Sequence, residues 1–287
     1  MKRRSFFKTL GLASGSLASS RMLQAAKPAE ETEFMSVLVD TTLCAGCRGC
    51  EEICAEVNNL PEPDLDQSLE GIVRKTSTTQ WSVINRYEAD VDGGEVYVKR
   101  QCMHCNQPAC ASACLTKAML KTKEGPVVWR GEKCMGCRFC MVSCPYDIPK
   151  FEYDSPNPKI LKCRMCAERL QEGKLPACVE NCPAEALTFG TRRDMLALAR
   201  TRIAEEPDKY VPHIYGENEV GGTGWLYLSA VPFEQIGFRT DLGSTPYPEY
   251  TREFLYAVPV ILTLFPAFLY AVSNATKRNA DETEGED

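Results

Sequence analysis

Sixteen cysteines are gathered in four groups of four, and two of the groups have the spacing C-x2-C-x2-C-x3-C. Three thiolates at this spacing can reach three corners of a 4Fe-4S cluster, and the last cysteine of a partner group supplies the fourth. The groups must therefore work in pairs, and four groups predict four clusters. In chain order they are Cys44, Cys47, Cys50 and Cys54; Cys102, Cys105, Cys110 and Cys114; Cys134, Cys137, Cys140 and Cys144; and Cys163, Cys166, Cys178 and Cys182.

The chain between the groups indicates which of them pair. Only residues 115–133 separate the second group from the third, and residues 118–129 predict a strand, a turn and a strand. This is the internal hairpin of a two-cluster ferredoxin, so the second and third groups form a natural pair, here called the inner half. The first and fourth groups pair by exclusion and form the outer half, which nests one ferredoxin unit inside another.

The expected fold class is α+β, with two nested bacterial-ferredoxin-like units, four 4Fe-4S clusters and a C-terminal transmembrane helix. Residues 36–200 should form the cluster domain, with a hairpin inserted at 80–100, where apolar residues alternate on both sides of a glycine turn. Thr191 precedes a helix expected over 194–206 in a capping-box-like arrangement. Residues 201–253 are rich in Pro, Gly and aromatic residues and predict an extended strap that packs on a partner subunit.

The two ends of the chain carry targeting signals. Residues 1–26 begin with a twin-arginine pair, two phenylalanines and a lysine before an uncharged stretch, which is typical of a twin-arginine signal for export of a folded protein. Residues 254–272 carry no charge and are long enough for one transmembrane helix. The basic pair Lys277-Arg278 lies in the acidic tail 273–287, and the positive-inside rule then places the main domain on the periplasmic side of the inner membrane.

Three other uses of the cysteines are weaker. Disulfides at this density are typical of small secreted domains and do not explain the repeated two-residue spacing. Zinc fits best at the fourth group, whose C-x2-C-x11-C-x3-C spacing resembles a zinc ribbon, but it would leave the first group without a partner. Covalent c-type haem is excluded because no C-x-x-C is followed by histidine.

Few other residues could take part in chemistry, and no catalytic residue is predicted. His104 lies between two cysteines, where it could donate a hydrogen bond to a sulfide or simply pack. Arg48, Arg138 and Arg164 directly follow cysteines, where positive charge would raise a cluster's potential, unless they form ordinary surface ion pairs. Gly221–Gly224 lacks the order of a phosphate-binding loop and predicts a turn. The net charge of -6 argues against binding to nucleic acid.

Longer stretches resemble a known family. Residues 36–200 resemble the four-cluster electron-transfer subunits of respiratory molybdopterin oxidoreductases and quinone-linked nickel-iron hydrogenases. The resemblance is greatest to the iron-sulfur subunits of periplasmic hydrogenases of the hydrogenase-2 type. It is carried by KRQCMHCNQPAC (99–110), CRFCMVSCPYDIPKFEY (137–153), PACVENCPAEALTFGTRRDM (176–195) and PHIYGENEVGGTG (212–224).

The resemblance implies one ligand set for each cluster, with the last cysteine exchanged between paired groups. In the outer half the sets are Cys44, Cys47, Cys50 and Cys182, and Cys163, Cys166, Cys178 and Cys54. In the inner half they are Cys102, Cys105, Cys110 and Cys144, and Cys134, Cys137, Cys140 and Cys114. Ala55 and Leu115 follow Cys54 and Cys114 where the family has proline, which changes the turn but not the ligand.

The sequence therefore predicts an electron-transfer subunit. Four 4Fe-4S clusters would relay electrons between a catalytic subunit, expected to be a nickel-iron hydrogenase, and a multi-pass membrane subunit that handles quinone. An equivalent subunit of a molybdopterin enzyme acting on formate or on a sulfur or nitrogen oxyanion is the alternative within the same chemistry. A non-redox, membrane-tethered assembly protein held together by disulfides or zinc is the alternative from another class.

Overall fold

The computed structural model describes residues 33–90 and 94–283. The chain forms two units, Met1–Glu33 and Phe34–Asp287, and the described residues belong almost entirely to the second. The signal predicted at 1–26 lies outside the described residues, as do the last residues of the tail. Short strands and short helices alternate along the second unit, which is the mixed content expected of a ferredoxin-like domain.

A three-stranded sheet joins the beginning of the domain to two later segments. Its order is β8-β1-β9, with β1 antiparallel to β8 and parallel to β9. Val37 in the middle strand lies opposite Phe189 on one side and Trp225 on the other. The strands are β1 (Met35–Asp40), β8 (Leu187–Thr191) and β9 (Trp225–Leu228).

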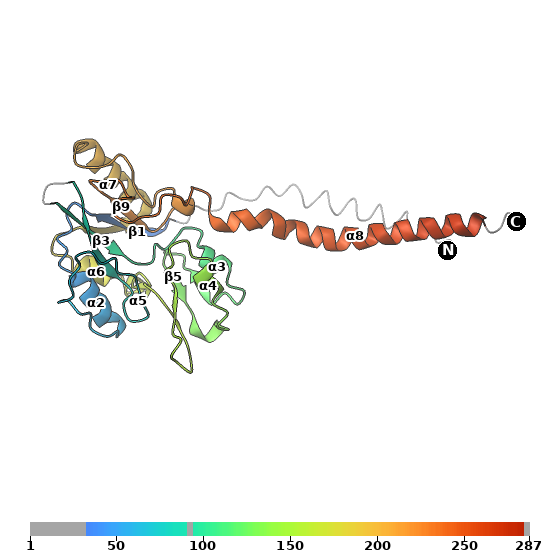
Figure 1. The fold of residues 1–287 in the computed structure, drawn as a ribbon, viewed down its shortest axis with the longest axis horizontal. Coiled ribbons are helices and arrows are strands. Elements are labelled where there is room, and N and C mark those ends of the chain that lie inside the picture. The colour runs from blue at the N-terminus through green and yellow to red at the C-terminus, as the bar shows by residue number, and fades with distance from the viewer. Residues whose placement is uncertain (1–32, 91–93, 284–287) are drawn as a thin grey trace. The chain divides into compact units, whose positions relative to one another are not determined.

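Both faces of this sheet are covered, which explains why nearly every residue of β1 and β9 is buried. Helix α7 (Arg192–Glu205) packs on one face of the sheet (Figure 1). Leu38 of β1 and Ala199 of α7 belong to the core between them. The opposite side chains, which include Val37 and Trp225, belong to the larger core. Cysteines of the outer half line the edge of that core, so the sheet supports their positions.

An N-cap sets the start of α7. Thr191 Oγ1 accepts a hydrogen bond from the Asp194 N–H at 3.2 Å and donates one to Asp194 Oδ2 at 2.6 Å. The sequence predicts a helix over 194–206, whereas the observed helix begins at Arg192. The difference arises because helical geometry begins at the residue directly after the N-cap.

Three hairpins provide the other strands. β2 and β3 pair antiparallel within residues 80–100, with Val83 opposite Arg100. β4 and β5 pair between the second and third cysteine groups, where the sequence predicts two strands and a turn. The strands are β2 (Val83–Glu88), β3 (Glu95–Arg100), β4 (Met119–Lys121), β5 (Val127–Trp129), β6 (Lys150–Phe151) and β7 (Ile160–Leu161).

Short helices carry the third cysteine of each group. Helix α2 packs against α6, which brings the first and fourth groups together, and α3 packs against α4, which brings the second and third together. A further helix, α5, follows Cys166. The helices are α2 (Gly49–Asn58), α3 (Ala109–Ser112), α4 (Phe139–Val142), α5 (Ala167–Gln171) and α6 (Ala177–Glu180).

The segment predicted as an extended strap contributes to the core of this chain. It contains β9, and its side chains Tyr215, Tyr227 and Phe238 form an aromatic cluster. The ring centroid of Phe238 lies 4.6 Å from that of Tyr215 and 4.8 Å from that of Tyr227. Burying large rings is strongly favourable, so this aromatic-rich segment packs on the chain's own sheet.

A long helix, α8 (Tyr247–Thr283), begins within the last residues of this segment and contacts α3. It begins before and ends after the span predicted at 254–272. Tyr247–Asn274 is long and apolar enough to cross a membrane by length and composition, and most of its side chains are exposed. Pro259 and Pro266 lie inside the helix.

Candidate metal centres

Two cavities of the outer half are each lined by four cysteines. One is lined by Cys44, Cys47, Cys50 and Cys182, and the other by Cys54, Cys163, Cys166 and Cys178. These are the two sets that the resemblance implies, including the exchange of the last cysteine between the groups. Most of the other lining side chains are apolar, so each cavity combines soft thiol ligands with a wall that limits access of water.

Electrostatic effects connect two cysteines of the inner half to the other members of the sets that the resemblance implies for them. The pKa of Cys105 is raised first by burial and then by Cys102, Cys144 and Cys110. The pKa of Cys140 is raised to about 11, again first by burial and then by Cys114, Cys134 and Cys137. The cavities therefore bring the eight outer cysteines into two sets of four, and the pKa effects connect Cys105 and Cys140 each to three cysteines of the inner half.

All sixteen cysteines, which lie within the described residues, are unpaired thiols. Five are buried, two are exposed and the rest are half-buried. In residues 33–90 and 94–283, no three His, Cys, Asp or Glu side chains converge closely enough to hold a single metal ion. In the outer half each set instead surrounds a space, which suits a polynuclear cluster with one thiolate for each iron. The buried cysteines are Cys102, Cys110, Cys140, Cys163 and Cys178, and the exposed ones are Cys47 and Cys137.

Left-handed backbone at the C-x2-C steps aims successive thiols toward one point. Gly46 and Arg48 flank Cys47 with φ angles of 69° and 62°, and Gly136 and Arg138 flank Cys137 with angles of 71° and 60°. Glycine adopts such angles without strain, whereas arginine does so at some cost. The repeated angles in the first and third groups explain how one spacing makes the same turn twice.

Burial dominates the electrostatics of the second outer set. It raises the pKa of Cys54 and Cys163 to about 12 and that of Cys178 to about 11. Lys99 opposes this effect at all three thiols. A thiol in such an environment stays protonated and unreactive until a metal replaces its proton, which fits structural ligation rather than nucleophilic chemistry.

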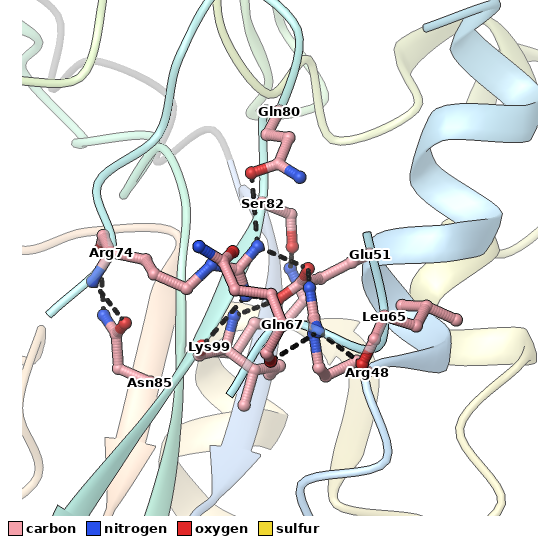
Figure 2. Close-up of polar contacts among 10 residues, drawn as sticks. Arg48, Glu51, Leu65, Gln67, Arg74, Gln80, Ser82, Asn85 and Lys99 are labelled. Atoms are coloured by element: carbon pink, nitrogen blue, oxygen red, sulfur yellow. Dashed lines mark hydrogen bonds and ion pairs between the residues drawn. The ribbon is translucent and has the colours of Figure 1, made fainter. Parts of the chain in front are cut away.

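A buried ion network fastens α2 to the residues around β2. Glu51 accepts two hydrogen bonds from the Arg74 guanidinium at 2.7 and 2.9 Å, and one from Arg48 Nη2 at 3.0 Å. Its carboxylate also accepts the backbone N–H of Ile84 in β2. Figure 2 shows Glu51 between the two arginines, with Arg48 also bonded to the carbonyl of Leu65. Because α2 carries Cys50 and Cys54, this network positions two ligands.

The three arginines that the sequence places beside ligands have different roles. Arg48 is 5% exposed and belongs to the network just described, so it is not a surface residue. The Arg138 guanidinium lies over the rings of Phe151 and Tyr153, 5.5 and 5.7 Å from their centroids. Arg164 forms an exposed ion pair with Glu168, which is the ordinary alternative.

His104 is fully buried between two ligands of the inner half. Its Nδ1 accepts a hydrogen bond from the Val127 N–H at 2.8 Å, so the ring proton is on Nε2. Burial first, and then Lys162 and Lys121, lower its pKa well below the usual value, so the ring is neutral. Nε2 lies near the backbone of Cys163 without a hydrogen bond of normal geometry among the described residues. A buried N–H of this kind suits a sulfide acceptor.

Sequence reasoning missed three lysines. Lys99 and Lys162 are buried, and Lys121 is half-buried. Lys162 Nζ donates to the carbonyls of Val127 and Cys163, and Lys121 Nζ donates to the carbonyl of His104 at 2.9 Å. The available signal was proximity along the chain, since Lys162 directly precedes Cys163 and Lys99 lies shortly before Cys102.

Comparisons with known proteins identify the family. The model of the 4Fe-4S dicluster domain family matches residues 95–192. Hydrogenase-2 operon protein HybA of Escherichia coli O157:H7 is 33% identical, over 100% of this chain and 99% of that protein. The iron-sulfur subunit of the nitrate-inducible formate dehydrogenase of E. coli K12 is 32% identical, over 67% of this chain and 66% of that subunit. A protein of Nitratidesulfovibrio vulgaris Hildenborough is 45% identical, over 100% of this chain and 80% of that protein.

The cysteine sets and the matching domain define a ferredoxin-like protein that binds 4Fe-4S clusters and transfers electrons. More particularly, the chain belongs to the family of iron-sulfur subunits of respiratory oxidoreductases that includes HybA and the formate dehydrogenase iron-sulfur subunits. The resemblance and the predicted cofactor are thereby confirmed, and the sixteen cysteines fit four clusters. The comparisons do not favour the non-redox assembly protein held together by disulfides or zinc.

Proposed function

We propose that this chain relays electrons through four 4Fe-4S clusters between a periplasmic nickel-iron hydrogenase and a quinone-reactive membrane subunit. The observation that carries the proposal is the pair of cavities lined by Cys44, Cys47, Cys50 and Cys182, and by Cys54, Cys163, Cys166 and Cys178. In both, residues from the first and fourth groups meet, as the exchange of ligands requires. The similarity to HybA over the full chain favours a hydrogenase as the partner.

The proposed nesting places two ferredoxin-like units one within the other. Helix α2 against α6 makes the outer unit, and α3 against α4 makes the inner one. The inner ligand sets are then Cys102, Cys105, Cys110 and Cys144, and Cys134, Cys137, Cys140 and Cys114. The mutual pKa effects of the inner cysteines support both sets.

When bound, the clusters supply the one-electron redox chemistry. The chain's own residues hold the ligands, exclude water and place charges and hydrogen-bond donors. Tyr146 packs against buried residues around the cavities, and Trp225 lines the cavity of Cys54. Their bulk keeps the surroundings of the clusters apolar, which affects reduction potential.

The inner half is the proposed exit toward the membrane. Large apolar side chains are exposed beside its ligands: Leu115 and Val142 are each 87% exposed, and Phe139 is 62% exposed. Helix α3 of this half contacts the candidate membrane helix α8. An apolar rim beside a membrane anchor suits contact with a membrane-embedded subunit.

The proposed location is the periplasmic side of the inner membrane, with export in the folded state through the twin-arginine signal at 1–26 and anchoring through α8. Replacing Arg3 and Arg4 by lysine should leave the protein in the cytoplasm, where it can be detected by fractionation. Export of that variant at the normal level would contradict the proposed route.

The partner is tested by elemental analysis of the complex purified anaerobically from detergent-solubilised membranes. We expect nickel together with abundant iron. Molybdenum or tungsten without nickel would instead identify the second candidate, the equivalent subunit of a molybdopterin enzyme, which the formate dehydrogenase relatives favour. Zinc with little iron would contradict cluster binding altogether.

The exchange of ligands is tested by Cys182→Ser in the purified complex. Although Cys182 belongs to the fourth group in the sequence, its loss should perturb the cluster of Cys44, Cys47 and Cys50, and Cys54→Ser should perturb the other outer cluster. EPR spectra of the reduced complex distinguish the two variants. Perturbation of the same cluster by Cys182→Ser and Cys178→Ser would contradict the exchange.

A further inference from the structure

Lys99 is a buried cation placed between the two cavities of the outer half. Its side chain lies on β3, and the residue is 2% exposed. Nζ donates to Ser82 Oγ at 2.6 Å and to Gln101 Oε1 at 3.2 Å, and it lies 5.0 Å from the centroid of the Trp225 ring. Lys99 lines both cysteine cavities, and among the described residues it is the one charged side chain that they share.

The described protein residues do not neutralise this charge. No ion pair joins Lys99 to a carboxylate in residues 33–90 and 94–283. The buried acid of the same region, Glu51, is already bound by Arg48 and Arg74, as Figure 2 shows beside Lys99 and Ser82. Burying a cation without a counterion is costly. The anionic groups that can offset this cost are the cysteine thiolates that line the two cavities.

Electrostatic effects connect Lys99 to both ligand sets. Burial lowers the pKa of Lys99, but the surrounding cysteines together, of which Cys178 and Cys50 have the largest effects, raise the pKa above the usual value. Cys178 belongs to one set and Cys50 to the other. In the inner half, by contrast, other cations oppose the effect of burial on the thiol pKa. Lys162 acts on Cys110, and Lys121 acts on Cys105.

We propose that Lys99 is a positioned charge that raises the reduction potentials of both outer clusters together. A cluster with four thiolates is net negative and becomes more negative on reduction, so a nearby fixed cation stabilises the reduced state more than the oxidised state. Because Lys99 lines both cavities, it stabilises an added electron on either cluster. This inference rests on the proposed occupation of the two outer cavities by clusters.

The test is an EPR-monitored redox titration of the purified complex carrying Lys99→Gln. We expect both outer potentials to fall, each by an amount equivalent to a tenfold change in the reduction equilibrium, or about 59 mV for a one-electron couple. The reduction potentials of the inner clusters should not change. In Lys99→Arg, which keeps the charge, the outer clusters should have the potentials of the unaltered complex. The signals are assigned beforehand with Cys182→Ser and Cys54→Ser.

A second pair of variants keeps the lysine, in case Lys99→Gln does not assemble. Ser82→Asp sets a carboxylate against Nζ and should lower both outer potentials, whereas the matched Ser82→Asn, without charge, should shift them much less. Unchanged outer potentials in Lys99→Gln and Ser82→Asp, or an equal shift of all four, would overturn the inference. Absence of iron and of cluster signals in the unaltered complex would instead refute the proposed function.

Discussion

The outer and inner halves use the same cysteine spacing in different surroundings. In the outer half, burial raises the pKa of Cys178 to about 11, and the cation of Lys99 opposes it. At the edge of the inner half, burial also raises the pKa of Cys114, but several hydrogen bonds together, led by the one from the backbone N–H of Met119, lower it below its usual value. Hydrogen bonds to sulfur and nearby charge both tune cluster potentials, so one motif can give unlike clusters.

The halves also differ in how they are supported. The outer half rests on the three-stranded sheet, on α7 and on the buried carboxylate of Glu51. The inner half has the two-stranded hairpin β4–β5 and a small core that includes Met119 and Val127. The outer half therefore has the more extensive support, while the inner half exposes large apolar side chains beside its cysteines.

The largest expected loss of stability comes from Glu51→Gln. This change leaves Arg48 and Arg74 buried without a counterion, which should lower the free energy of unfolding by about 3–5 kcal/mol. This change in the free energy of unfolding is measured by urea titration, with the bleaching of the clusters as the signal. Glu52→Gln, on the same helix but exposed, should change the free energy of unfolding by less than about 0.5 kcal/mol. Equal effects of the two variants would show that the network does not support the outer half.

An intermediate effect is expected from Thr191→Ala, which removes the N-cap of α7. The free energy of unfolding of the outer half should fall by about 1 kcal/mol, measured by the same urea titration. Thr201→Ala lies on the exposed face of the same helix and should be neutral or slightly stabilising. If Thr191→Ala destabilises the inner clusters as much as the outer ones, the halves do not differ in their support.

The smallest effect on stability, with a large effect on assembly, is expected from Leu115→Glu and Val142→Glu. Both side chains are exposed, so unfolding should change by less than about 0.5 kcal/mol. Their charges should nevertheless disrupt the apolar contact with the membrane subunit, and quantitative co-purification measures this loss. Val73→Glu, 61% exposed in the outer half, is the matched control. Normal assembly of Leu115→Glu and Val142→Glu would contradict the proposed exit.

Local signals predicted much of the cluster domain. The strand, turn and strand between the second and third groups appear as β4 and β5, because short-range alternation and turn residues specify a hairpin. The N-cap at Thr191 could also be predicted, because capping depends only on residues that are close in the sequence. The packing of residues 201–253 on the chain's own sheet could not be predicted locally. β9 pairs with β1 over a long sequence separation, and no local pattern identifies such a partner.

Burial of charged residues was the other property that sequence reasoning missed. Alternation along β3 places Lys99 on the same face as Glu95 and Tyr97, which reads as the solvent side of a hairpin. That face is buried at Lys99 because both outer cysteine groups cover it. Likewise, the sequence gives no sign that Arg48 is buried, and the structure shows it in an ion pair with Glu51 inside the domain.

The sequence by itself determined the chemistry, because ligand type and spacing dictate which cofactor can bind, and sixteen cysteines in four groups suit 4Fe-4S clusters. It also determined the candidate membrane helix, since apolarity and length are local properties. Only the tertiary structure decided which groups meet and which charge lies between them. Those features depend on the packing of distant segments in a low-dielectric interior, where one cation such as Lys99 acts on two ligand sets at once.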